Sequence, residues 1–124
     1  MPLIQAELSE KIIGCCIRAH KTLGPGFLEK IYEEALCLEL TKAGLKYERQ
    51  KTVTVIYDGK AIGEHRLDLV VDGLVVLELK ATAGIDDIHL ATSRSYLKAT
   101  ALQLALVVNF ARPTLDIKRV VLTH

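Results

Sequence analysis

The stretch of sequence that decides the fold is Arg66-Leu67-Asp68-Leu69-Val70-Val71-Asp72-Gly73-Leu74-Val75-Val76-Leu77-Glu78-Leu79-Lys80. It reads as two apolar strands joined at Asp72-Gly73, and this dipeptide is the strongest short-range signal for a β-hairpin. Charged residues interrupt these runs of Leu and Val, at positions where a buried strand ordinarily carries apolar side chains: Asp68, Glu78 and Lys80. The stretch therefore predicts a hairpin and, within it, a candidate site.

The register of this hairpin follows from the alternation of side chains along a strand. The odd-numbered apolar residues are Leu67, Leu69, Val71, Val75, Leu77, Leu79 and Ala81. If they form one buried face, the charged residues all fall on the other face: Arg66, Asp68, Glu78 and Lys80. A strict two-residue turn would set Asp68 opposite Leu77, on the wrong face. A three-residue loop, with Gly73 in the left-handed conformation beside a bulge, restores the parity.

Length and composition predict a single domain over residues 1–124, long enough to bury a core. Half of the residues are hydrophobic and the mean hydropathy is +0.26, which favours an exposed apolar patch, most simply a homodimer interface. The net charge of +1 and the pI near 7.7 give no electrostatic footprint for nucleic acid, although they leave room for a local basic patch.

The three cysteines, Cys15, Cys16 and Cys37, have no zinc-site spacing and cannot all pair within one chain. We interpret them as reduced core residues of a cytoplasmic protein. The N-terminal residues lack the basic and apolar regions of a signal peptide, and no apolar run reaches transmembrane length. The turn 23–26 has neither the dinucleotide-binding nor the P-loop spacing of glycines. We therefore expect no membrane association and no small-molecule cofactor.

Helical periodicity predicts three helices. The first starts near Glu10, with Ser9 as its N-cap, and ends at the turn 23–26. The second covers residues 27–43, and the third runs from residue 86 or 87 to about residue 100. The apolar residues expected to face the core are Leu28, Ile31, Ala35 and Leu38 in the second helix and Ile88, Ala91 and Leu97 in the third.

Runs of β-branched and apolar residues predict five strands. Residues 52–57, 61–71 and 74–81 form an antiparallel meander, and residues 102–110 form a strand covered on both faces. Residues 117–122 form a last edge strand. The predicted order is α-α-β-β-β-α-β-β, an α/β (α+β) fold in which helices flank a mixed central sheet.

The charged residues of the hairpin have the arrangement that metal-assisted phosphodiester hydrolysis needs. Mg²⁺ prefers carboxylate oxygens and keeps several waters, so Asp68 and Glu78 can hold it while a substrate phosphate completes its shell. Lys80, two residues after Glu78, can orient the attacking water and offset negative charge in the transition state. The alternative is that these residues and Arg66 form cross-strand ion pairs on a solvated face.

A second motif, Gly26-Phe27-Leu28-Glu29-Lys30-Ile31-Tyr32, resembles the signature of the GxxExxY proteins, a branch of the PD-(D/E)XK nuclease-like superfamily. The resemblance covers nearly the whole chain, including residues 23–26, 66–68, 78–80, 95–100 and 109–110. It implies a restriction-endonuclease-like core of order α-β-β-β-α-β. That order agrees with the periodicity, with one helix added in front.

The resemblance also implies roles for individual residues. Asp68 and Glu78 would be ligands of Mg²⁺ or Mn²⁺, with the Leu79 carbonyl as a further candidate, and Lys80 would be the catalytic lysine. Glu29 would be an additional acid near the metal; alternatively, it is only a residue that suits a capping position and the positive end of a helix. Tyr32 is expected to pack in the core with its hydroxyl satisfied.

One position departs from the family pattern. Relatives usually carry Gln one helical turn before the tyrosine of the third helix, whereas this chain has Thr92 before Tyr96. His89, in the same helix, is expected to be a surface or capping residue. The sequence predicts a metal-dependent nuclease-fold protein that hydrolyses phosphodiester bonds in nucleic acid. The alternative is a catalytically weak or inactive nuclease-fold subunit that binds nucleic acid or protein.

Overall fold

The computed structural model describes residues 4–124. Its elements are α1 (Ala6–Leu23), α2 (Glu29–Lys42), β1 (Tyr47–Tyr57), β2 (Lys60–Val71), β3 (Val75–Lys80), α3 (Asp87–Thr100), β4 (Leu104–Asn109) and β5 (Asp116–Val121). The order α-α-β-β-β-α-β-β is the predicted one. Among the described residues, no helix combines the length and the apolar character that crossing a membrane requires.

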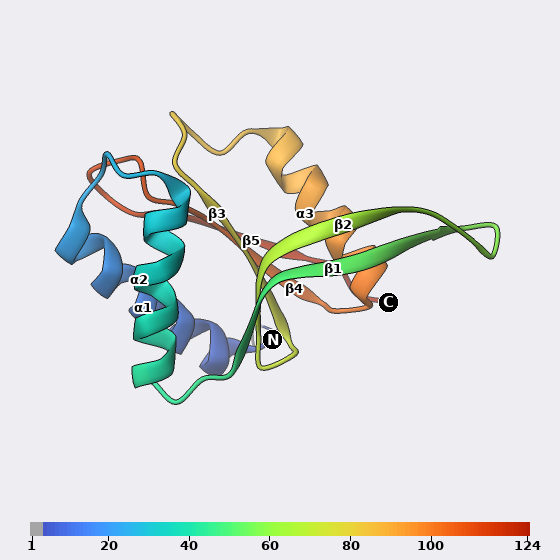
Figure 1. Ribbon diagram of the computed structural model, residues 1–124, viewed down its shortest axis with the longest axis horizontal. Coiled ribbons are helices and arrows are strands. Elements are labelled where there is room, and N and C mark those ends of the chain that lie inside the picture. The colour runs from blue at the N-terminus through green and yellow to red at the C-terminus, as the bar shows by residue number, and fades with distance from the viewer. Residues whose placement is uncertain (1–3) are drawn as a thin grey trace.

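The five strands form one mixed sheet in the order β1-β2-β3-β4-β5. Neighbouring strands are antiparallel except β3 and β4, which are parallel. Parallel neighbours need a long crossover connection, and α3 provides it. Figure 1 shows α1 and α2 on one side of the sheet and α3 on the other, so the predicted mixed sheet flanked by helices is confirmed.

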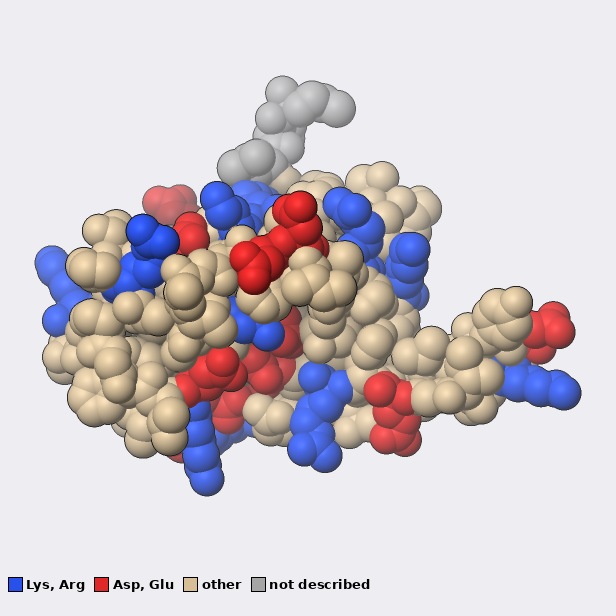
Figure 2. Space-filling model, turned by 90° about the horizontal axis from the view of Figure 1, so that it is seen from above, with Lys and Arg blue, Asp and Glu red and all other residues tan. Residues whose placement is uncertain are grey.

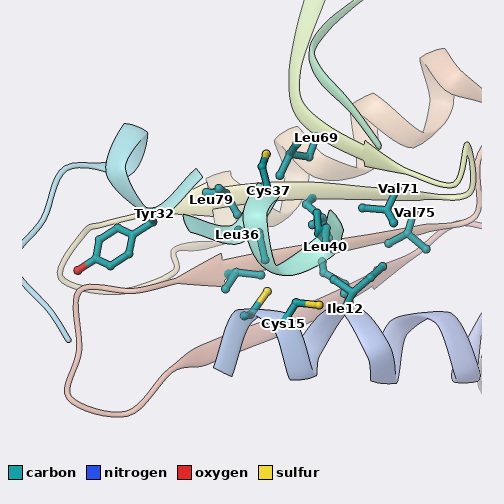
Figure 3. Close-up of a cluster of buried hydrophobic side chains, with 14 of the residues drawn as sticks. Ile12, Cys15, Tyr32, Leu36, Cys37, Leu40, Leu69, Val71, Val75 and Leu79 are labelled. Carbon is teal, nitrogen blue, oxygen red and sulfur yellow. The ribbon is translucent and has the colours of Figure 1, made fainter. Parts of the chain in front are cut away.

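The main apolar core lies between the sheet and the helices α1 and α2 (Figure 3). It includes the three cysteines, which are buried free thiols, as predicted. A smaller cluster on the opposite face packs Leu97 of α3 against residues of β2, β3, β4 and β5. Because β4 is covered on both faces, all six of its residues are buried, which explains its unbroken apolar sequence before Asn109.

The predicted register of the β2–β3 hairpin is confirmed at its turn. Val71 pairs with Val75 and Leu69 with Leu77, which leaves a three-residue loop at 72–74. Gly73 in this loop has φ +66°, and the N–H of Leu74 donates to the carbonyl of Val71 at 2.9 Å. The extra residue sets the odd-numbered apolar residues of both strands on the same face near the turn.

The predicted common face does not extend to Leu67, which is a correction. Leu69 packs under α1 and α2, whereas Leu67 packs in the cluster on the α3 side. Two residues that are two apart share a face only in a regular strand. The regularity is lost at Asp68, which lies opposite Gln50 of β1, and Gln50 has the unusual φ of +50°. The strand therefore changes face at the position of the first candidate carboxylate.

The first helix begins earlier than predicted. It starts at Ala6, so Ser9 lies inside α1 and does not cap it. The Ser9 hydroxyl donates to the carbonyl of Ala6 at 3.1 Å and accepts a hydrogen bond from Arg119 of β5 at 3.0 Å. The extra turn forms because Leu8 packs against the core, which local capping rules do not take into account.

The predicted apolar stripe of α2 is wrong. Leu28, Ile31 and Leu38 are exposed, whereas the neighbouring stripe with Tyr32, Leu36 and Leu40 is buried. Both stripes are apolar, so periodicity alone cannot choose between them. Tyr32 decides the choice, because its ring stacks on Phe110 with the ring centroids 4.5 Å apart. The exposed stripe fits an apolar contact surface, and the homodimer stays a prediction.

The apolar stripe of α3 is only partly as predicted. Leu97 is fully buried, but Ile88 is 67 % exposed and Ala91 is also exposed. Ser93 takes the position facing the sheet one turn before Leu97 and is buried. The helix begins close to the predicted residue, after Asp86, and His89 completes its capping box, since its Nδ1 accepts the Asp86 N–H at 3.0 Å. The capping role expected of His89 is confirmed.

The strands β1 and β2 are longer than the core needs. The structure starts β1 at Tyr47 rather than at residue 52, and the far ends of both strands project from the body of the molecule as a two-stranded arm (Figure 1). Ile56, Tyr57 and Ile62 are exposed on this arm. The base of the arm carries Arg66 and Asp68, so the arm begins beside the candidate site.

Candidate active site

The two candidate carboxylates meet where the β2–β3 hairpin opens. Regular pairing ends at Leu69 and Leu77. Beyond that point the N–H of Leu79 donates to Asp68 Oδ2 at 2.8 Å, and the N–H of Asp68 donates to Glu78 Oε1 at 3.2 Å. Each carboxylate thus binds a backbone group of the neighbouring strand. These hydrogen bonds place an oxygen of each carboxyl group between the two strands.

The backbone carbonyl of Leu79 faces the same gap. In a strand the N–H and the C=O of one residue point to the same side. The N–H of Leu79 points to Asp68, whereas the carbonyl of the next residue, Lys80, accepts from Phe110 after β4 at 2.9 Å. The open end therefore presents two carboxylates and one carbonyl, and these oxygen donors are the kind that Mg²⁺ and Mn²⁺ prefer.

Burial and mutual repulsion make these carboxyl groups hard to ionise. Glu78 is only 5 % exposed, and desolvation followed by the charge of Asp68 raises its pKa to about 8. Desolvation also raises the pKa of Asp68, although the hydrogen bond from Leu79 opposes the shift. Without a cation nearby, the charged forms of the two groups are costly. A divalent ion in the gap would offset this cost.

The cross-strand ion-pair interpretation of these charges is wrong. Within residues 4–124, none of Arg66, Asp68, Glu78 and Lys80 takes part in an ion pair. Glu78 is also buried, which does not fit a solvated face. Lys80 lies two residues after Glu78 on β3 and is close enough to favour the ionised forms of both carboxyl groups. The two acids therefore have no ion-pair partner among residues 4–124, and a lysine lies at the edge of the site.

A cleft of about 600 Å³ opens onto Asp68 from the side of α2. Its lining residues are Glu29, Lys30, Glu33, Arg49, Gln50, Arg66, Asp68 and Leu79. Figure 2 looks onto this end of the sheet and shows acidic side chains gathered in the middle of the face, with Lys and Arg side chains beside them. The cleft gives an outside ligand access to the open end of the hairpin.

Glu29 is the first residue of α2 and lines this cleft, where its charge contributes to the raised pKa of Asp68 and of Glu78. Among residues 4–124, however, no group of three or more His, Cys, Asp or Glu side chains is close enough to share one metal ion. The described donor set is therefore two carboxylates and a carbonyl. Such a set still fits Mg²⁺, because this ion keeps several waters. The metal role of Glu29 stays a prediction.

Tyr32 explains why Glu29 stands at the cleft. Its hydroxyl donates to the carbonyl of Gly24 at 2.6 Å and accepts the N–H of Phe27 at 3.2 Å. The ring is fully buried, so Tyr32 packs in the core with its hydroxyl satisfied, as expected. The tyrosine ties down the loop before α2, in which Gly26 has φ +109°. This contact sets where α2 begins and therefore where its first acid lies.

A clamp between α2 and β1 was not predicted. Arg49 donates to Glu33 Oε2 at 2.8 Å and also binds Glu34, and Gln50 donates to Glu33 Oε1 at 2.7 Å. The clamp holds β1 at the residue with the unusual φ, directly opposite Asp68. Its members come from elements far apart in the sequence. In the sequence, the only indication of this clamp is Glu33, an acid on the buried side of a helix.

Asn109 holds the chain segment that follows Lys80, and the sequence does not predict this role. It is fully buried at the end of β4, where its Oδ1 accepts the N–H groups of Thr82 and Ala111, both at 3.2 Å. Its Nδ2 donates to the Thr82 carbonyl at 2.9 Å. These bonds hold the chain that leaves β3 after Lys80. The sequence indication of this role is an amide at the end of an otherwise apolar run, because a buried amide must find hydrogen-bond partners.

The α3 wall of the site carries Tyr96, whose pKa burial and the charges of Glu78 and Asp68 raise to about 12. Its ring packs edge-on against His65 of β2, with the centroids 4.7 Å apart. Thr92 lies one turn earlier, and no hydrogen bond joins its hydroxyl to Asp68 or Glu78 in the part of the chain that the structure describes. The amide that the family resemblance leads us to expect at this position is absent.

The sequence model of the PD-(D/E)XK nuclease superfamily matches residues 6–120, and the chain belongs to this superfamily. The match covers all eight elements except the last residue of β5. No curated protein and no solved structure matches the chain. Superfamily membership confirms the fold that the resemblance implied, whereas the roles of the individual site residues stay predictions.

Proposed function

We propose that this protein is a Mg²⁺- or Mn²⁺-dependent nuclease that hydrolyses phosphodiester bonds in nucleic acid. The observation that carries the proposal is the convergence of Asp68 and Glu78 in the open end of the hairpin, where neither is paired with a cationic side chain within residues 4–124. A structural role alone would favour neutral side chains in such a buried gap. Two buried carboxyl groups without an ion-pair partner make sense if a cation from solution joins them.

Each residue has a defined task in this proposal. Asp68 and Glu78 hold the metal, with the Leu79 carbonyl and waters as further ligands, and Glu29 binds those waters from the α2 side. An ion held there would supply Lewis-acid polarisation of the phosphodiester and would lower the pKa of a bound water. Lys80 orients the attacking water and offsets the negative charge that develops on the phosphate oxygens. The hydrogen bonds from the backbone N–H groups keep both carboxylates in place before the metal arrives.

A second candidate function is a nuclease-fold subunit that binds nucleic acid or protein without turnover. Thr92 favours it, because the site lacks the amide that relatives carry one turn before Tyr96. The raised pKa of Glu78, about 8, also favours it, since the free protein keeps this carboxyl group mainly protonated at neutral pH. Metal binding must then displace a proton, which lowers the apparent affinity.

Calorimetric titration with Mg²⁺ and Mn²⁺, together with cleavage assays on DNA and RNA, tests the proposal. Asp68→Asn and Glu78→Gln should each lower metal affinity and reduce cleavage by roughly 100-fold or more, because several kcal/mol of charge stabilisation depend on the metal. Glu64→Gln is the matched control, since it removes an exposed carboxylate from the same strand outside the cleft. Its metal affinity and activity should equal those of the wild type.

Lys80→Ala separates chemistry from metal binding. It should retain the metal affinity of the wild type and lose cleavage. A wild-type protein that binds neither ion and cuts no substrate would contradict the nuclease proposal. Binding of metal and nucleic acid without cleavage would favour the second candidate.

A further inference from the structure

Two arginines line the cleft. The protein's own carboxylates bind Arg49 but not Arg66 among residues 4–124. The guanidinium of Arg49 is engaged by Glu33 and Glu34. Arg66 is exposed and makes neither an ion pair nor a side-chain hydrogen bond within residues 4–124, although Asp68 and Glu29 line the same cleft. Arg49 therefore serves the protein's own structure, whereas the donors of Arg66 are free for an anion from outside.

The position of Arg66 relative to Asp68 indicates where an anion bound by Arg66 would lie. The two residues are two apart on β2, and both line the cleft. Two residues along a strand span roughly 6.6 Å. A group bound by Arg66 therefore lies beside, and not on top of, a phosphate held at Asp68. Lys30, on the α2 wall of the cleft, is also without an ion pair in the described part of the chain.

We propose that Arg66 binds the phosphate next to the scissile one, so that the preferred substrate is a nucleic-acid strand with at least two successive phosphates. This inference rests on the proposed function of the carboxylate site. The planar guanidinium matches the geometry of a phosphate and can bind it through two parallel hydrogen bonds. Asp68 and Glu78 repel a polyanion, and Arg66, which lines the cleft together with Asp68, offsets that repulsion.

The inference distinguishes this site from one built for small diesters. A substrate with a single phosphodiester occupies only the carboxylate end and leaves Arg66 without a partner. A substrate with a second phosphate contacts both ends of the cleft. Because the additional contact is made away from the reacting atoms, it acts as binding energy that a longer strand supplies.

The first test measures binding without turnover. Binding of a short single-stranded oligonucleotide is measured against salt concentration in the absence of divalent metal, for wild type, Arg66→Gln, Arg66→Lys and Lys118→Gln. Arg66→Gln should weaken binding about 10-fold, because it removes a charge-assisted hydrogen bond. It should also reduce the slope of log affinity against log salt by about 0.7, the value of one phosphate contact on a single strand.

The two other variants control for charge and for geometry. Lys118→Gln removes the same charge from an exposed position of β5 outside the cleft, and its slope should equal that of the wild type. Arg66→Lys should keep the slope, because the charge remains, and recover only part of the affinity, because the ammonium lacks the planar fork. A merely structural role of Arg66 would instead lower the melting temperature and leave the slope unchanged.

The second test compares cleavage of a trinucleotide with two phosphodiesters and a dinucleotide with one, with Mg²⁺ present. The wild type should prefer the trinucleotide, and Arg66→Gln should reduce that preference in kcat/KM about 10-fold. An unchanged salt slope or an unchanged preference would overturn the assignment of Arg66 while leaving the nuclease intact. If the wild type cleaves neither compound but Arg66→Gln still reduces the salt slope of binding, the nuclease proposal is overturned and the phosphate contact of Arg66 stands.

Discussion

The two ends of the β2–β3 hairpin are joined by different interactions. At the turn, Val71, Leu69 and their partners on β3 form a regular ladder with apolar side chains packed into the core. At the open end, the ladder is replaced by bonds from backbone N–H groups to the carboxylates of Asp68 and Glu78. One pair of strands thus has a regular apolar ladder at one end and the candidate site at the other.

The comparison shows how a buried site is obtained from a stable scaffold. The closed end, which is the end of the hairpin at the turn, buries apolar side chains and stabilises the fold. The open end buries acids, and the raised pKa of Glu78 records the energetic cost of keeping them there. The loss of regular pairing opens a gap in which oxygen atoms can converge on a cation. Stability is lowered locally where the proposed function requires it.

The largest effect is expected from a substitution at the closed end. Leu77 is fully buried in the main core, and Leu77→Ala should lower the free energy of unfolding by about 2–5 kcal/mol. Chemical denaturation monitored by circular dichroism measures the change. Leu74→Ala is the control, since Leu74 lies in the loop and is 42 % exposed. A loss below that of the control would show that the closed end is not the scaffold of the hairpin.

A substitution at the open end should act with the opposite sign. The pKa of Glu78 is about 8 in the folded protein against 4.5 ordinarily, so the folded state holds a proton that the unfolded state releases between these values. The wild-type stability therefore falls as pH rises from 4.5 to 8. Glu78→Gln removes this dependence and should stabilise the metal-free protein at pH 9 by on the order of 2 kcal/mol.

Denaturation at pH 4 and at pH 9 checks the sign of this effect. At pH 4 the carboxyl group is protonated in both states, so the difference between Glu78→Gln and the wild type should be small. Glu64→Gln, at an exposed position of β2, should show no such pH dependence. If Glu78→Gln destabilised the protein more at pH 9 than at pH 4, the open end would not hold a costly acid.

The smallest effect is expected in the loop that sets the register. Gly73 has φ +66°, and a Cβ built there meets no atom within 4 Å, so Gly73→Ala tests backbone strain alone. It should lower the free energy of unfolding by about 1 kcal/mol. Gly84→Ala is the matched control, because Gly84 also has open space and lacks a positive φ. Equal stabilities of the two variants would contradict a role of Gly73 in the turn.

The local features of the fold were predictable because they depend on residues that are neighbours in the chain. Asp72-Gly73 and the parity of the flanking apolar residues are sufficient to predict the three-residue loop. The same applies to the order of the elements. Asp68, Glu78 and Lys80 were recognised because charged residues interrupt apolar strands, which is visible without any knowledge of the tertiary contacts.

Choices between alternatives of similar apolarity were not predictable. The buried face of α2 depends on the stacking of Tyr32 on Phe110, which is 78 positions later in the chain. The change of face at Asp68 depends on the backbone of Gln50 in the neighbouring strand. Such contacts join remote segments, and no short stretch contains both partners.

The sequence by itself determined the hairpin, its three-residue loop, the order of helices and strands, and the presence of Asp68, Glu78 and Lys80 in the hairpin. Only the tertiary structure decided that Asp68 and Glu78 share a gap and that Glu78 is buried enough for a raised pKa. It also decided that Arg49 is bound by Glu33 and Glu34, whereas Arg66 has no such partner among residues 4–124. The physical reason is that chemistry resides in residue types, whereas burial and charge neutralisation depend on which neighbours folding brings together.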